Sequence, residues 1–320
     1  MRIDYDFIKI LTGTDFSIRK LPLIRADSGR RGPTIWLTAG VHGDEVGSVV
    51  IVQEIFRRIR KLGLLSGKLY SFPLMNPVGL ETISRKLILT EEDINRCFPG
   101  KPNGTLAERI AYKIFSTILE TKPDFVIDLH NDWINSIPYV IIDPYPGLKL
   151  RQTWINAKNI GFLTNFPVVR ENLESIDEMK KTLTFNLLHN GIPSLTIELG
   201  GAYILDEKMI ITGVEAVWTI LVSLKMVKPI PPQLVFRLPK IIRRRLLTYS
   251  NKPLTSKSGI IRFFVKPGQI VKKDTAVARV NNIFGKVEEI LRAPHDGIVL
   301  GYSDSAVVVP GMTVIALGLL

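Results

Sequence analysis

The chain contains very little cysteine and histidine. Among its 320 residues there is one cysteine, Cys97, and there are four histidines. A single cysteine excludes an internal disulfide, and we interpret Cys97 as a small buried hydrophobic residue. Because histidine is so scarce, the search for a metal site built on imidazole is confined to few positions.

Long apolar runs are also lacking. The longest stretches with almost no charge, residues 209–224 and 306–320, are interrupted by Glu215 and by Pro310-Gly311. A membrane-spanning helix needs about 20 consecutive apolar residues, so neither stretch predicts a span. The residues that follow Met1 carry no apolar signal core. We therefore expect a cytoplasmic protein with no membrane partner.

Acidic residues are outnumbered by basic ones, 30 to 42, which gives a formal charge of +12. An excess of positive charge favours anionic partners. Arg243-Arg244-Arg245 is the only tight basic cluster in the sequence, whereas a nucleic-acid surface needs clustered bases. The sequence favours a small anionic substrate over nucleic acid. It is equally compatible with a monomer and with a homo-oligomer.

Strand and helix patterns alternate over residues 1–230 and predict an α/β domain. Residues 1–32 are interpreted as strands and turns, and residues 143–173 give only local helical hints. Prolines at 229, 231 and 232 then mark a domain boundary. The expected strands are 33–38, 68–75, 123–130, 137–142 and 193–199, and the expected helices are 46–62, 105–120, 173–190 and 206–226.

Residues 231–320 predict a smaller C-terminal all-β domain, because glycine, proline and valine alternate there with charges. Segments 265–273 and 293–299 resemble the paired halves of a biotinyl/lipoyl-like barrel-sandwich. Lys286 falls where a biotinyl or lipoyl lysine would lie, but its neighbours Gly285 and Val287 are not the methionines of a biotin site. We expect a structural neighbour of the active site, not a swinging carrier.

Candidate metal ligands lie at the ends of two expected strands. His42 and Glu45 occupy the turn between strand 33–38 and helix 46–62, and His130 ends strand 123–130. Ligands bind at the carboxyl ends of strands in open α/β sheets. Each residue alone would be interpreted as a capping or loop residue. Together they supply the three protein ligands of a catalytic zinc, which leaves a fourth position open.

The other two histidines lack this placement. His189 lies at an expected helix C-terminus, and His295 lies in a turn. Asp128, two residues before His130, points to the same side of its strand. It either orients the His130 imidazole or makes ordinary strand-end hydrogen bonds.

Four short motifs follow one another in a specific order along the chain. They are Gly43-Asp44-Glu45, Asn95-Arg96-Cys97-Phe98-Pro99-Gly100, Asp128-Leu129-His130 and Glu198-Leu199-Gly200-Gly201. With this set the chain resembles the succinylglutamate desuccinylase/aspartoacylase family of zinc-carboxypeptidase-like deacylases. The resemblance implies a mixed sheet flanked by helices, one Zn²⁺ per chain, and removal of an acyl group from the nitrogen of an amino acid or related amine.

The resemblance also implies roles for residues outside the metal set. Glu198 corresponds to the general base, and it ends an expected strand at the same sheet edge. Arg85 would stabilise charge on the carbonyl oxygen, although a surface arginine is the alternative. Asn95 and Arg96 would bind a substrate carboxylate, because a guanidinium fork contacts it at two points. Arg170 is a further candidate contact without a motif.

The expected function is therefore a zinc-dependent hydrolase that cleaves the amide bond of an N-acyl amino acid or related small N-acylated amine. Zinc-bound water would attack with Glu198 as base. The alternative is a metallocarboxypeptidase that acts on peptide C-termini. A non-catalytic binding protein is disfavoured because no ligand or base position is lost.

Overall fold

The computed structural model describes residues 1–12 and 16–320. Within this part, thirteen strands form one mixed sheet in the order β1-β2-β4-β3-β5-β9-β7-β8-β10-β17-β15-β12, with β6 paired to β15. These strands are β1 (Arg2–Thr12), β2 (Ile18–Asp27), β3 (Thr34–Ala39), β4 (Lys68–Phe72), β5 (Phe125–Asn131), β6 (Asn135–Ser136), β7 (Tyr139–Ile142), β8 (Val168–Arg170), β9 (Ser194–Leu199), β10 (Leu246–Ser250), β12 (Ile270–Val271), β15 (Gly297–Tyr302) and β17 (Ile315–Leu319).

A second, four-stranded sheet has the order β14-β13-β11-β16. Its strands are β11 (Gly259–Phe263), β13 (Ala276–Asn281), β14 (Val287–Arg292) and β16 (Val307–Val308). The helices are α1 (Val46–Leu62), α2 (Pro77–Thr82), α3 (Leu106–Glu120), α4 (Arg151–Leu163), α5 (Ile176–Met179), α6 (Leu183–His189) and α7 (Glu207–Ser223). Short 3-10 turns are η1 (Ile94–Arg96), η2 (Leu148–Leu150), η3 (Leu173–Ser175) and η4 (Lys240–Ile242).

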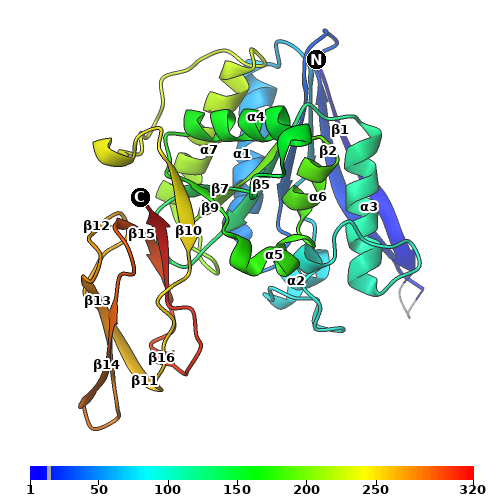
Figure 1. Cartoon of the computed structure of the whole chain (residues 1–320). Helices are drawn as coiled ribbons and strands as arrows, with labels where there is room; N and C mark the ends of the chain where they lie inside the picture. Colours follow the sequence, from blue (N-terminus) through cyan, green and yellow to red (C-terminus); the bar gives the residue numbers. More distant parts are fainter. Residues whose placement is uncertain (13–15) are drawn as a thin grey trace.

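Helices cover both faces of the larger sheet, and two apolar cores lie between them. Figure 1 shows α1, α4 and α7 on one side of the sheet and α3 and α6 on the other. Alternation along β3 explains this division, because Ile35 and Leu37 join the core under α1 and α7, whereas Trp36 joins the core under α3. The expected α/β architecture is confirmed, and α1 has the predicted bounds.

The centre of the sheet is parallel. Strand β3 pairs in parallel with β4 and β5, and β5 pairs in parallel with β9. Strand β7 then runs antiparallel to β9. The carboxyl ends of β3, β5 and β9 therefore meet at one edge, which is where the predicted metal ligands and Glu198 lie.

The single helix predicted over residues 173–190 is wrong. The chain forms η3, α5 and α6 instead, and α6 begins only after Thr182. The Thr182 hydroxyl accepts a hydrogen bond from the Phe185 amide, so it caps the N-terminus of α6. The Lys181 carbonyl accepts from the Phe98 amide at 3.0 Å, which ties the interruption to another loop. These tertiary and capping contacts outweigh the helical periodicity.

Residues 143–173, which the sequence left uninterpreted, supply η2, α4 and β8. Strand β8 pairs with β7, and β10 pairs with β8, so the larger sheet continues into residues 231–320. This C-terminal part is β-rich, and its own apolar core lies around Val277, Val299 and Val314. The barrel-sandwich likeness and the boundary near residue 230 stay predictions.

Among the described residues, no helix is both long enough and apolar enough to cross a membrane.

Candidate metal centre and substrate pocket

The three predicted metal ligands converge on one point. His42 and Glu45 lie in the turn between β3 and α1, and His130 lies near the end of β5. Their exposed fractions are 2%, 3% and 3%, and one ligand atom from each lies within 4.8 Å of the others. Glu45 Oε1 lies 2.5 Å from His42 Nδ1, and Glu45 Oε2 lies 3.0 Å from His130 Nδ1. The parallel pairing of β3 with β5 therefore brings the three side chains together, as the strand-end pattern predicted.

Each imidazole contacts a second carboxylate through its other ring nitrogen, Nε2. His42 Nε2 lies 3.2 Å from Asp93 Oδ1, and His130 Nε2 lies 3.0 Å from Asp128 Oδ2. Asp128 is fixed in turn by a 2.6 Å hydrogen bond from the Thr38 hydroxyl. A carboxylate behind a histidine is the usual way to fix the ring nitrogen that binds metal. This geometry favours the orienting role for Asp128 over simple strand-end bonding.

The donor set fits zinc. Two imidazole nitrogens and one carboxylate are common ligands of catalytic zinc, and they stand here at the wall of a cavity that leaves one side open. Burial alone would raise the pKa of Glu45, but the charges of His42 and His130 bring it well below its usual range. A carboxylate that stays ionised is available to a cation.

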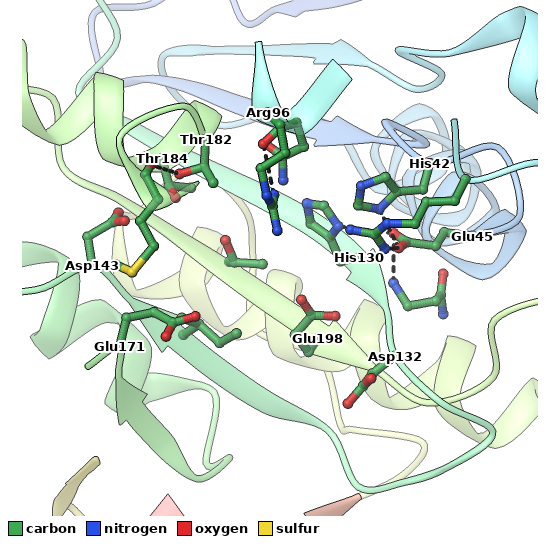
Figure 2. A pocket seen from close by; sticks show the side chains of 16 residues that line it. His42, Glu45, Arg96, His130, Asp132, Asp143, Glu171, Thr182, Thr184 and Glu198 are labelled. Atoms are coloured by element: carbon green, nitrogen blue, oxygen red, sulfur yellow. Dashed lines mark hydrogen bonds and ion pairs between the residues drawn. The ribbon is translucent and has the colours of Figure 1, made fainter. Parts of the chain in front are cut away.

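The cavity measures about 170 Å³, and sixteen residues line it. Figure 2 shows His42, Glu45 and His130 at one end, Glu198 and Arg96 in the middle, and Asp143 and Glu171 at the far end. The lining residues are His42, Glu45, Arg85, Asn95, Arg96, His130, Asn131, Asp132, Ile141, Asp143, Glu171, Met179, Thr182, Thr184, Thr196 and Glu198.

Glu198 stands beside the metal ligands because β9 pairs with β5, in a register that sets it opposite His130. Burial raises the pKa of the Glu198 carboxyl to about 8, and Asp132 and Glu45 add to the rise, whereas His130 and Arg85 oppose it. A carboxyl whose pKa lies near neutrality can both accept and return a proton. This is the property that the sequence assigned to Glu198.

Arg85 reaches the metal ligands from the long loop after α2. Its Nε lies 3.3 Å from Asp93 Oδ2, and its Nη1 lies 3.7 Å from Glu45 Oε1. Asp93 therefore contacts both Arg85 and His42. Arg85 is not an isolated surface arginine, since its guanidinium faces the cavity beside Glu45.

Asn95 and Arg96 line the same cavity from η1. The Asn95 side-chain oxygen accepts from the Leu183 amide at 3.2 Å, so only its NH₂ group can be offered to a ligand. Arg96 Nη1 donates to the Asn95 carbonyl at 2.9 Å, and Arg96 Nε lies 3.9 Å from the exposed Glu178. The structure thus brings all seven predicted site residues to one cavity.

Several lining residues were missed by the sequence analysis. Asp143 and Glu171 are the clearest, and the residue expected instead, Arg170, does not line the cavity. Asp143 directly follows an expected strand, so the strand-end rule could have found it. Glu171 follows β8, which gave no sequence signal. Cys97 is partly buried, and burial raises its thiol pKa to about 11, as expected for an unreactive side chain.

Comparisons with known proteins point to one family. The model of the succinylglutamate desuccinylase/aspartoacylase catalytic domain matches residues 31–224. The N-alpha-acetyl-L-2,4-diaminobutyric acid deacetylase of Halomonas elongata is 31% identical over 131 residues, which are 40% of this chain and 38% of that protein. The chain therefore matches well under half of the length of this curated relative.

Solved structures share the fold. The product-bound ectoine utilization protein EutE from Ruegeria pomeroyi has a TM-score of 0.81 at 22% identity, over 99% of this chain and 95% of that one. A metallo-carboxypeptidase from Burkholderia cenocepacia has a TM-score of 0.52 at 17% identity, over 69% of this chain and 65% of that one.

Proposed function

The chain belongs to the succinylglutamate desuccinylase/aspartoacylase family, and from that premise we propose that it is a zinc-dependent hydrolase of N-acyl amino acids. It would cleave the amide bond between the acyl group and the amino nitrogen and release a carboxylate and a free amine. The observation that carries the proposal is one cavity that joins a buried His-Glu-His cluster, an acid with a pKa near neutrality and an arginine fork.

His42, Glu45 and His130 would hold one Zn²⁺ per chain. When bound, zinc would polarise the amide carbonyl and lower the pKa of a water to about 7. Asp93 and Asp128 keep the two Nδ1 atoms directed toward Glu45. The ligand set is therefore organised before any substrate arrives.

Glu198 moves the proton that the reaction must transfer. Its carboxylate accepts a proton from the attacking water, whose oxygen forms the new bond to the carbonyl carbon. The same proton then passes to the departing nitrogen as the C–N bond breaks. Arg85 stands beside Glu45 and supplies fixed positive charge where the carbonyl oxygen becomes negative.

Arg96 and Asn95 orient the amine half of the substrate. A guanidinium binds a carboxylate at two points, and the Asn95 NH₂ group adds a third donor. Both come from η1, whose start is capped by Asp93. The loop that carries Asn95 and Arg96 therefore also carries Asp93, which contacts the proposed metal ligand His42.

The relative from Halomonas elongata, an N-alpha-acetyl-L-2,4-diaminobutyric acid deacetylase, supports deacylation of an N-acylated amino acid. The similarity to the Burkholderia cenocepacia metallo-carboxypeptidase supports the alternative, cleavage of peptide C-termini, less strongly because it covers less of the chain.

The test is a substrate panel with zinc-loaded protein. N-acetyl, N-succinyl and N-formyl amino acids are compared with unblocked tetrapeptides, and released amine is measured. We expect turnover of acylated amino acids. Release of C-terminal residues from the tetrapeptides, with no turnover of the acylated amino acids, would establish the carboxypeptidase instead.

A further inference from the structure

We propose that Asp143 and Glu171 bind a positively charged amino group on the amine half of the substrate. The preferred substrate would then be an N-acyl amino acid with a cationic side chain. This inference rests on the proposed deacylase function and adds the substrate class.

The two acids occupy equivalent places on neighbouring parallel strands. Ile142 of β7 pairs with Arg170 of β8, so Asp143 and Glu171 are the next residues along. The Glu171 amide donates to the Ile142 carbonyl at 3.0 Å, which keeps this register one step beyond the strands. The backbone therefore places the two acidic residues next to each other at the ends of neighbouring strands.

The pair shares a sheet face with Glu198. In the antiparallel β7–β9 register, Tyr139 lies opposite Glu198 and Ile141 lies opposite Thr196. Alternate residues of a strand point to one face, so Asp143 lies on the same face of the sheet as Tyr139 and Ile141, and Ile141 and Asp143 line the cavity. Four residues of strand separate Asp143 from the level of Glu198, or about 13 Å of backbone. A substrate side chain of several carbons fits that separation.

The two buried acids have no ion-pair partner among the described residues, although the charge of Arg96 acts on Glu171 from a greater distance. Asp143 is only 6% exposed and yet lines the cavity. Within residues 1–12 and 16–320, neither Asp143 nor Glu171 takes part in an ion pair. The Thr184 hydroxyl donates a hydrogen bond to the Asp143 carboxylate, and the Asn172 amide donates one to the Glu171 carboxylate. A buried carboxylate is costly without a counter-charge.

The pKa values agree with this description. Burial raises the pKa of Asp143 to about 7, and the charge of Glu171 contributes to the rise. Burial also raises the pKa of Glu171 to about 7, although Arg96 opposes it. An ammonium group between the two acids would favour their ionised forms, because an opposite charge nearby lowers the pKa of a carboxyl.

Arg96 does not fill this role. Within the described chain, Arg96 forms its ion pair with Glu178, which does not line the cavity. Its guanidinium is assigned to the substrate carboxylate, which leaves a second, negatively charged position further along the cavity. An amino acid with an amino group in its side chain carries both complementary charges, whereas an acidic side chain would meet repulsion.

Two matched pairs of substrates test the proposal. Nα-acetyl-L-lysine is compared with Nα-acetyl-L-norleucine, and Nα-acetyl-L-ornithine with Nα-acetyl-L-norvaline, at pH 8. Members of each pair differ only in the terminal ammonium. We expect the cationic member of at least one pair to have a roughly tenfold to hundredfold higher kcat/KM, which is the weight of a charge-assisted hydrogen bond. Glu171→Gln and Asp143→Asn should remove that preference, because kcat/KM should fall far more for the cationic member of each pair than for the neutral member. The exposed Glu174→Gln should keep the preference of the native protein.

Calorimetric binding of free L-lysine, L-ornithine, L-norleucine and L-norvaline separates this inference from the deacylase function. If the protein cleaves no acylated amino acid but binds L-lysine or L-ornithine, and if this binding is lost in Glu171→Gln, the subsite is supported and the deacylase function is refuted. Equal kcat/KM values for the neutral and cationic members of both pairs would refute the subsite and leave the deacylase function standing. An equal fall in kcat/KM for all substrates in Glu171→Gln would also refute the subsite. So would a second metal ion per chain in the native protein that is missing in Glu171→Gln.

Discussion

At the scale of single residues, the metal cluster depends on three side chains that no other part of the described chain duplicates. His130→Ala removes one imidazole and leaves Asp128 with only its hydrogen bond from the Thr38 hydroxyl. We expect zinc content, measured by elemental analysis, to fall well below one per chain. His189→Ala is the matched control, because His189 lies on α6, where it contacts the carbonyl and the ring of Phe185 and no metal ligand among the described residues. Full zinc occupancy in His130→Ala would make the ligand assignment wrong.

Glu198→Gln tests the proton transfer. Glutamine is nearly isosteric but cannot accept the proton, so kcat should fall by roughly 10²–10⁴-fold, the usual weight of a positioned base. Zinc content and thermal unfolding should match the native protein. A variant with native turnover would remove Glu198 from the mechanism.

Asp143→Asn tests the buried acid through stability. The folded-state pKa of Asp143, about 7, lies above its ordinary value of 3.8. Its contribution to stability is therefore fully present below the ordinary value and is lost as the pH rises through about 7. Asparagine does not ionise, so the variant should gain Tm relative to the native protein at pH 8 and gain less at pH 5. Scanning calorimetry at both values, with Glu174→Gln as control, checks this, and a gain independent of pH would contradict it.

At the scale of elements, the interruption before α6 shapes the wall of the cavity. Thr182 caps α6 and lines the cavity with Thr184. Loss of an N-cap costs about 1 kcal/mol, which lowers Tm by roughly 1–2 °C in a chain of 320 residues. Thr105→Ala, which removes the cap of α3, should cost a similar amount. Only Thr182→Ala should also raise KM. An unchanged KM would mean that the interruption does not position substrate.

Sequence periodicity predicted helices α1, α3 and α7 and the central strands of the larger sheet, but it failed at this interruption. Residues 173–190 have helical spacing, and the break depends on a cap and on the Lys181–Phe98 contact, which joins distant parts of the chain. Strand β8 was missed for a related reason. Three residues are too few to show a period, and β8 is a strand because β7 and β10 pair with it.

At the scale of the whole molecule, the C-terminal residues support the catalytic part. Strand β10 pairs with β8, and an apolar core that includes Tyr139 and Val169 lies against residues of β15 and β17. Asp304 accepts hydrogen bonds from the Ile134 amide at 2.9 Å and from the Asn135 side chain at 3.2 Å. The loop that follows His130 is therefore held by a residue of the C-terminal part. Figure 1 shows β10 and β15 of this part, which continue the larger sheet.

A chain that ends at residue 230 should consequently lose cooperative thermal unfolding, because β8 and the apolar residues beside it become exposed to water. Asp304→Ala in the full chain should keep the fold and lower kcat/KM only a few-fold. A shortened chain that unfolds cooperatively and stays active would establish residues 1–230 as an independent domain.

The sequence by itself predicted where the metal ligands and Glu198 lie. His130 and Glu198 end apolar strands, His42 and Glu45 follow another, and strand ends of a parallel sheet meet at one edge wherever the sheet forms. The roles of Glu198 as base and of the arginines came from the order of the four motifs and the family that they resemble. The order of the strands was not needed to find these residues.

Only the tertiary structure decided what the rest of the cavity contains. Asp143 and Glu171 are 28 positions apart in the sequence, and they come together through the β7–β8 register. The continuity of the sheet into residues 231–320 likewise depends on the pairing of β10 with β8. Pairing between distant strands is chosen by the burial of both faces at once, and no local stretch of sequence carries that information.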